Sequence, residues 1–323
     1  MFDCAPLSSA SHTQPLVPLQ QSEVWLRATC TLGSDARRER VGDACVLTLR
    51  KSLPIIGELA LLSRAQLNLT AEGAANLRET LGARHLIVNS DTFDDAVALA
   101  QAGFHNIGAP RMVAELPLDA PPEQMAHRLA PKWRNRLRHG QSQRLELRRR
   151  LMPADPDHWL LRAEATQSAR LWYQPLPPEM IAALAASKPG CAQLFTAYHL
   201  GQRICAMLFL RHGGTATYQI GWTTEEGRKR SAGPVLMWRA MVELQQMGVS
   251  AIDLGAADPE RAPGLVRFKR GTGAELRALG GTWLDTSWAR RKRQSARHRV
   301  IEELRGTRHT HLLSTARAVQ STR

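Results

Sequence analysis

The chain has 323 residues, of which 43% are hydrophobic and 22% charged, which is enough for two globular domains with separate cores. No apolar run approaches the roughly 18 residues that a membrane-spanning helix needs. The N-terminus lacks the basic and then apolar order of a secretory signal, so we expect a cytoplasmic protein. The net charge of +14 favours an anionic partner, namely nucleic acid, a lipid surface or a phosphorylated small molecule.

The positive charge is concentrated in two stretches. From residue 286 to the end, ten Lys and Arg residues stand against two Glu, and a second basic cluster runs from Arg128 to Arg150. We interpret residues 286–323 as a basic C-terminal tail and residues 1–17 as a short polar lead-in. The five cysteines form no CxxC pair and no metal-ligand spacing, so the sequence predicts no metal site.

The first half of the chain alternates between strand-like and helix-like patterns. In chain order, we expect a helix within 18–32, strands over 43–50 and 53–63, a helix from Thr70 to about Gly82, a strand over 85–90, a helix from Asp91 to Gly103 and a strand over 112–118. The strand over 112–118 is expected to close this half.

The second half repeats a similar order. We expect a helical stretch over 121–139 with a kink or split at Pro131, a strand over 145–152, helices over 155–172 and 177–187, strands over 191–200, 203–211 and 215–223, a helix over 234–246, and strands over 250–256 and 274–284. Two similar orders of mixed strands and helices predict two α/β domains of one type, over 18–120 and 121–285.

A basic, small-residue turn connects the strand over 215–223 to the helix that follows it. A helix N-terminus offers free backbone N–H groups and the positive end of the helix dipole, so such a turn is suited to bind phosphate. The side chains that would add positive charge or allow close approach of a pyrophosphate are Arg228, Lys229, Arg230, Ser231, Ala232 and Gly233.

These motifs resemble those of the GNAT superfamily of N-acyltransferases. That family carries an (R/Q)xxGx(G/A) turn at this place, and this chain has Arg228-x-x-Ser231-x-Gly233, with Ser in place of the first Gly. The stretch GLVRFKRGTG over 264–273 is similar to the GLxRFKxGxG of the FemAB-type branch, in which two GNAT-like domains follow one another. The basic RNRLR over 134–138 and the segment 49–63 also resemble that branch, and the resemblance covers roughly residues 15–285.

The resemblance implies a mixed α/β fold of the α+β type, with two tandem GNAT-like domains that each have a mostly antiparallel central sheet flanked by helices. It further implies direct transfer of an acyl group from acyl-CoA, a co-substrate rather than a tightly bound cofactor, to an amine acceptor. Much of the rate would come from holding the two substrates in line. The strand over 215–223 would be splayed from its neighbour and would align the pantetheine arm.

Three residues are candidates for the catalytic chemistry. Lys269 matches the lysine of the FK motif and would stabilise the oxyanion or a substrate phosphate. Asp253 ends an apolar strand and would accept the proton of the amine. Tyr218 lies in the middle of its strand, where its hydroxyl could donate to the leaving thiolate.

Three further residues are candidates for binding substrate phosphate. Arg267 and Arg270 flank Lys269, and Lys51 lies where the FemAB-type resemblance implies a substrate-phosphate ligand.

Two other functions stay open at this stage. The first is a FemAB-type transferase of bacterial type that uses aminoacyl-tRNA to modify a peptidoglycan precursor, with the basic helix over 128–150 and the basic tail on tRNA phosphates. The second is a non-catalytic protein that binds nucleic acid or an anionic membrane surface through its tail. The absence of GxSxG, HExxH and Walker motifs argues against the common serine hydrolases, zincins and P-loop hydrolases.

Overall fold

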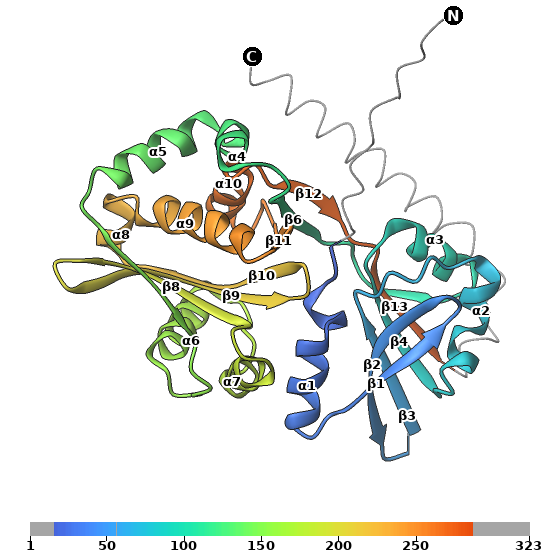
Figure 1. Ribbon diagram of the computed structural model, residues 1–323. Helices are drawn as coiled ribbons and strands as arrows, with labels where there is room; N and C mark the ends of the chain where they lie inside the picture. Colours follow the sequence, from blue (N-terminus) through green and yellow to red (C-terminus); the bar gives the residue numbers. More distant parts are fainter. Residues whose placement is uncertain (1–15, 56, 287–323) are drawn as a thin grey trace, which may run out of the picture.

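The structure, a computed structural model, describes residues 16–55 and 57–286. Two β-sheets lie beside each other, and helices pack on them (Figure 1). The lead-in up to residue 15 and residues 287–323 of the basic tail lie outside the described ranges. Within those ranges, none of the helices combines the length and the hydrophobicity needed to cross a membrane.

The first sheet has six strands in the order β1-β2-β3-β4-β13-β5. They are β1 (Asp35–Val41), β2 (Ala44–Leu53), β3 (Gly57–Ser63), β4 (His85–Ser90), β13 (Gly281–Thr286) and β5 (His105–Gly108). Only β3 and β4 pair in parallel. Helices α2 (Ala71–Thr80) and α3 (Phe93–Gln101) supply Leu77 and Leu99 to a core that also holds Trp283.

The second sheet has seven strands in the order β12-β6-β11-β10-β9-β8-β7. They are β12 (Glu275–Ala278), β6 (Met112–Pro117), β11 (Ala251–Ala256), β10 (Thr215–Thr223), β9 (Gln202–His212), β8 (Ala192–His199) and β7 (Glu146–Leu151). Only β10 and β11 pair in parallel. The expected fold class, mixed α/β with two mostly antiparallel sheets, is confirmed.

Helices cover both faces of the second sheet (Figure 1). One face carries α4 (Pro122–Arg128), α5 (Pro131–Gln141), α8 (Glu225–Lys229), α9 (Ala232–Gln246) and α10 (Pro263–Gly271), and the other carries α6 (Trp159–Leu171) and α7 (Pro178–Ser187). The break between α4 and α5 falls at Pro131, as expected, because a proline inside a helix removes one hydrogen bond and clashes with the preceding turn. Helix α1 (Glu23–Thr31) packs its Val24 and Ala28 in the same core as α6 and α7.

Each half of the chain contributes one strand to the sheet of the other half. The expectation that 112–118 closes the first half is wrong, because β6 pairs with β11 and β12. The expected single strand over 274–284 is two strands, β12 in the second sheet and β13 in the first. The chain turns at Gly280 and Gly281: a Cβ on Gly280 would lie 2.2 Å from the Thr92 carbonyl oxygen, and Gly281 has a φ of +85°. A boundary at residue 120 therefore does not separate the two sheets.

Two other differences from the expected elements have local causes. The strand-like run over 53–63 is interrupted before its glycine: β2 ends at Leu53 and β3 begins at Gly57, whose φ is +92°. Strand β1 was not predicted. It is an edge strand that exposes most of its side chains, so its sequence DARRERV lacks the apolar alternation of a half-buried strand.

Candidate active site

Strands β10 and β11 pair over only three residues and then separate. Their register covers Thr215 to Thr217 against Ala251 to Asp253. Beyond Thr217, strand β10 keeps its β9 partner but has a register shift between Tyr218 and Ile220. One edge of β10 is thus left without a strand partner among the described residues over its second half, as expected for the splayed strand that the resemblance implies.

Helix α9 follows the end of β10 in the chain after the short helix over 225–229, and its N-terminus is uncapped. Ser231 occupies the N-cap position with φ 52° and ψ 35° and makes no side-chain capping bond. Among the described residues, no acceptor takes the backbone N–H of Ala232 or Gly233. Free N–H groups at the positive end of a helix of this length form a site suited to a phosphate group. The left-handed backbone at Ser231 also explains why glycine is usual there.

The three basic residues before this turn lie on or next to the short helix α8, which Thr224 caps by accepting from the Gly227 N–H. Lys229 pairs with Glu225 at 2.9 Å, and the i,i+4 pair of Arg230 with Glu226 also forms. Arg228 is exposed and donates to the Thr223 carbonyl. The local charge is therefore partly neutralised, and Arg228 is the most available of the three.

Helix α5 packs closely on the start of α9. A Cβ on Gly140 would lie 2.4 Å from Val235 and 2.7 Å from the Ser231 carbonyl oxygen. His139 places its Nδ1 3.2 Å from the Ser231 hydroxyl. The conformation of the turn therefore depends on a glycine in α5, 91 residues before Ser231 in the sequence.

Asp253 lies where β10 and β11 separate, but both its carboxylate oxygens are occupied. One oxygen accepts from the Gly255 N–H at 2.7 Å, and the other is paired with the Arg64 guanidinium. Arg64 also binds Asp91 at 2.8 Å. Burial alone would lower the pKa of Arg64, but the carboxylates of Asp253 and Asp91 raise it above its ordinary value.

A second arginine extends this cluster across the two sheets. Arg277 lies 3.0 Å from Asp91 and 2.7 Å from Glu115. The residues Arg64, Asp91, Glu115, Asp253 and Arg277, hereafter the junction cluster, come from both sheets. Because the side chain of Asp91 is fully buried and that of Asp253 is 3% exposed, the cluster satisfies buried charges and joins the sheets.

Lys269 is buried close to the junction cluster. Its ammonium donates to the Ala256 carbonyl at 2.7 Å, and its exposed fraction is 4%. Burial lowers the pKa of Lys269 to about 8, and the charge of Asp253 opposes this shift. The structure therefore brings Lys269 and Asp253 to the same end of β11.

Tyr218 lies at the start of the free edge of β10. Its ring contacts Phe209 with centroids 5.3 Å apart, and a Cβ on Gly221 would overlap its hydroxyl. The hydroxyl makes no hydrogen bond to any described residue, and burial raises its pKa. It stays protonated and free to donate, as the predicted role requires.

The three predicted phosphate ligands do not gather at this place. Arg267 and Arg270 are exposed on α10. Lys51 is exposed on β2, opposite Leu59 and near the turn to β3. Its partner Leu59 precedes Arg64 by five residues, which corresponds to roughly 16 Å along a β-strand.

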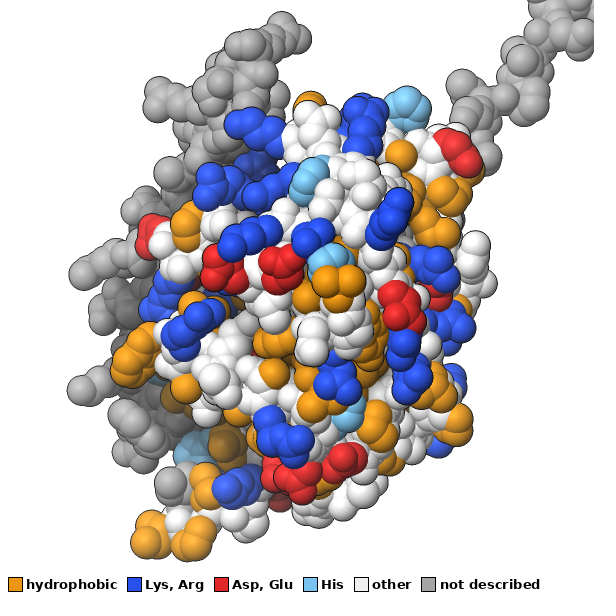
Figure 2. All heavy atoms as spheres, turned by 90° about the vertical axis from the view of Figure 1, so that its left-hand side faces the viewer, with side chains coloured by type: hydrophobic (Ala, Val, Ile, Leu, Met, Phe, Trp, Pro, Cys, Tyr) orange, Lys and Arg blue, Asp and Glu red, His pale blue; other side chains and the backbone are white. Residues whose placement is uncertain are grey.

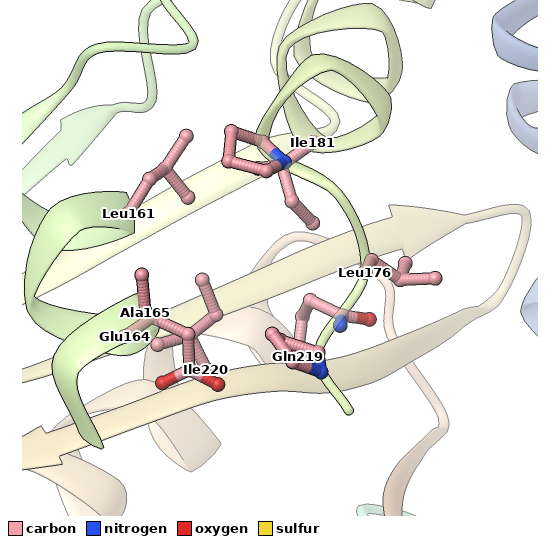
Figure 3. A pocket seen from close by; sticks show the side chains of 9 residues that line it. Leu161, Glu164, Ala165, Leu176, Ile181, Gln219 and Ile220 are labelled. Atoms are coloured by element: carbon pink, nitrogen blue, oxygen red, sulfur yellow. The ribbon is translucent and has the colours of Figure 1, made fainter. Parts of the chain in front are cut away.

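Sequence reasoning missed another buried carboxylate, Glu164 on α6. It lines a pocket between α6, α7 and β10, together with Leu161, Ala165, Pro175, Leu176, Pro178, Ile181, Gln219 and Ile220 (Figure 3). The signal that could have identified it is helical spacing: the buried residues of α6 are Leu160, Leu161, Glu164 and Ser168, so Glu164 lies on the apolar face. The described residues contain no cluster of His, Cys, Asp or Glu suited to a metal ion.

Residues 127–270 match the family described as the acetyltransferase (GNAT) domain. Among solved structures, FemX has 15% identity and a TM-score of 0.66, with 84% of this chain and 93% of that chain covered. No curated protein matches the chain.

Two further structures share the fold at TM-scores of 0.53. One is the C-terminal domain (DUF2156) of a protein assigned as a lysylphosphatidylglycerol synthetase from Agrobacterium fabrum, at 14% identity over 82% of this chain and 87% of that chain. The other is a conserved protein of unknown function from Bacteroides thetaiotaomicron, at 11% identity over 82% and 90%. Residues 127–270 therefore resemble the GNAT acetyltransferase domain, and the chain shares the fold of FemX.

Proposed function

We propose that this chain is an N-acyltransferase that transfers an acyl group directly from acyl-CoA to an amine acceptor. The observation that carries the proposal is the uncapped N-terminus of α9 together with the free edge of β10. The N–H groups of Ala232 and Gly233 would bind the pyrophosphate of the coenzyme, with Arg228 as the most available cation. The free edge of β10 would align the pantetheine arm.

The positions of two side chains support the catalytic roles proposed for them. Tyr218, which is protonated and whose hydroxyl has no hydrogen bond to a described residue, would donate to the departing thiolate. Lys269 would stabilise developing negative charge from its position near the end of β11. Asp253 is less suited to accept the proton of the amine, because Arg64 and the Gly255 N–H already occupy its two oxygens.

A second candidate is transfer of an aminoacyl group from tRNA, as the FemAB-like fold allows. The specific observation in its favour is helix α5, whose Lys132, Arg136 and Arg138 are exposed and form no salt bridge with described residues. Figure 2 shows the side of the molecule that carries α5 and α8, with basic side chains spread over it. Their charge would suit phosphates of a nucleic acid.

The two donors can be separated by calorimetric titration with acetyl-CoA and with bulk tRNA. The first proposal predicts binding of acetyl-CoA and its loss in Ser231→Glu, because a carboxylate would then occupy the anion site. Absence of acetyl-CoA binding at millimolar concentration would contradict it. Salt-sensitive tRNA binding that is lost when Lys132, Arg136 and Arg138 are changed to Gln would support the second candidate instead.

A further inference from the structure

The pocket that Glu164 lines is not used by the acyl-donor site described above. It is a small cavity of about 30 Å³ that is partly open to solvent. Apart from Glu164 and Gln219, every residue that lines it is apolar. Figure 3 shows Leu161 and Ile181 toward one end of the pocket and the carboxylate of Glu164 toward the other.

Glu164 is a buried carboxylate whose recorded partners are neutral. Its residue is 7% exposed. One oxygen accepts from the Tyr173 hydroxyl at 2.8 Å and the other from the Gln167 amide at 3.3 Å. No described Lys, Arg or His lies within ion-pair distance of it. A buried carboxylate without a counter-charge is costly to keep ionised, and a cation entering the pocket would supply what is missing.

The pocket also adjoins the strand that would align the acyl donor. Gln219 and Ile220 line it, and they lie at the register shift of β10. The Gln167 amide that binds Glu164 also donates to the Gly221 carbonyl on β10 at 2.9 Å. A group held against Glu164 is therefore close to the part of β10 that lies beyond its pairing with β11.

We propose that this pocket binds the acyl acceptor as a primary amine on a short apolar stem, with Glu164 as its counter-ion and proton acceptor. This inference rests on the proposed N-acyltransferase function. The small volume and the apolar walls favour a short aliphatic stem that extends toward solvent, and the single carboxylate favours one ammonium group. Tyr173 and Gln167 act as positioning residues, since each holds one carboxylate oxygen.

The chemical step balances with Glu164 and Tyr218. The ammonium of the acceptor gives one proton to Glu164, and the resulting amine attacks the thioester carbonyl. The C–N bond forms, the C–S bond breaks, and the thiolate of coenzyme A leaves as a thiol by taking the proton of the Tyr218 hydroxyl, which the second nitrogen-bound proton replaces. The products are the amide, the free thiol and protonated Glu164, which then releases its proton to solvent. Burial raises the pKa of Glu164, the Tyr173 hydroxyl opposes that shift, and the raised pKa makes the carboxylate a better base.

Binding of n-butylamine by ligand-observed NMR tests the pocket without coenzyme A. The neutral analogue n-butanol serves as the matched ligand, and Glu179→Gln removes a carboxylate from an exposed position on α7. We expect n-butylamine to bind the wild type and Glu179→Gln about tenfold more tightly than n-butanol, because a charge-assisted bond is lost in the alcohol. Glu164→Gln should abolish that preference. Equal binding of amine and alcohol by the wild type, or an unchanged preference in Glu164→Gln, would overturn the inference.

Acetyl transfer from acetyl-CoA to n-butylamine supplies the second readout, followed as release of free thiol. Glu164→Gln should lower kcat/KM for the amine by about 100-fold or more, the usual size of a general-base contribution, with the KM for acetyl-CoA within about twofold. Tyr173→Phe should lower kcat less than Glu164→Gln does and should shift the acidic limb of the pH profile.

The two proposals can fail separately. If the wild type prefers the amine over the alcohol but does not bind acetyl-CoA, the proposed donor is refuted and the amine pocket stands. Transfer that is unchanged in Glu164→Gln would refute the role of Glu164 alone.

Discussion

Two buried carboxylates of this protein, Asp253 and Glu164, differ in what surrounds them. Asp253 is paired with the Arg64 guanidinium within the junction cluster, whereas the recorded partners of Glu164 are the neutral groups of Tyr173 and Gln167. A carboxylate with a fixed cation stabilises the fold and has little capacity for another partner. One held only by neutral donors can still accept a proton or a cation, so the surroundings of a carboxylate decide its role more than its place at a strand end.

The largest effect should come from removing the cation of the junction cluster. Arg64→Met removes the positive charge that Arg64 places beside the buried carboxylates of Asp91 and Asp253. We expect a loss of about 3–5 kcal/mol in the free energy of unfolding. Urea denaturation of the full chain measures it. The matched control is Arg27→Met, whose pair with Glu23 is more than half exposed on both sides and should contribute at most about 1 kcal/mol. Similar losses in the two variants would show that the cluster does not hold the sheets together.

Lys269 should make the free energy of unfolding depend on pH in the alkaline range. Its pKa is about 8 in the folded state and 10.5 in the unfolded state, so the unfolded chain holds more protons between these values and stability rises with pH there. Lys269→Met removes this dependence. The stability of the wild type relative to the variant should therefore rise by up to about 3 kcal/mol between pH 7 and 10.5.

Unfolding of the wild type and Lys269→Met across this pH range gives the difference directly. Lys132→Met, a change at an exposed lysine, controls for the loss of one positive charge. A difference between the wild type and Lys269→Met that stays constant with pH would contradict burial of the ammonium.

Gly140→Val should disturb the anion site from a distance. Its side chain would overlap Val235 and the Ser231 carbonyl, and such overpacking costs about 1–3 kcal/mol. Acetyl-CoA affinity should fall as the turn shifts. Gly264→Val is the matched control, because a Cβ there meets nothing within 4 Å. Unchanged acetyl-CoA affinity in Gly140→Val would show that the packing of α5 does not shape the donor site.

The smallest effect concerns Ser231 itself. Glycine adopts a left-handed backbone at little cost, so Ser231→Gly should stabilise the chain by up to about 1 kcal/mol. Thermal unfolding detects this as a small rise in Tm, and acetyl-CoA binding should persist. A loss of stability would mean that the contact between the Ser231 hydroxyl and His139 outweighs the backbone strain.

The hydrophobic pattern of the sequence was sufficient to predict most of the second sheet and α9. Apolar residues in these strands form alternating or continuous runs, and those of α9 recur at helical spacing. This pattern could not predict that β6 joins the second sheet and β13 the first, because the hydrophobic pattern of a strand does not indicate which sheet it joins. The Arg64–Asp253 pair spans 189 residues, and no local pattern connects the two. Glu164 was overlooked because a glutamate in a helix usually faces solvent, although its spacing from Leu160 and Leu161 places it inward.

Hydrogen–deuterium exchange with saturating acetyl-CoA tests the central claim most directly. If α9 and the free edge of β10 form the acyl-donor site, protection should appear over residues 218–223 and at the start of α9, over 232–236. Arg64 and the neighbouring end of β3 should show none. Protection confined to the first sheet, or no protection at millimolar acetyl-CoA, would contradict the assignment.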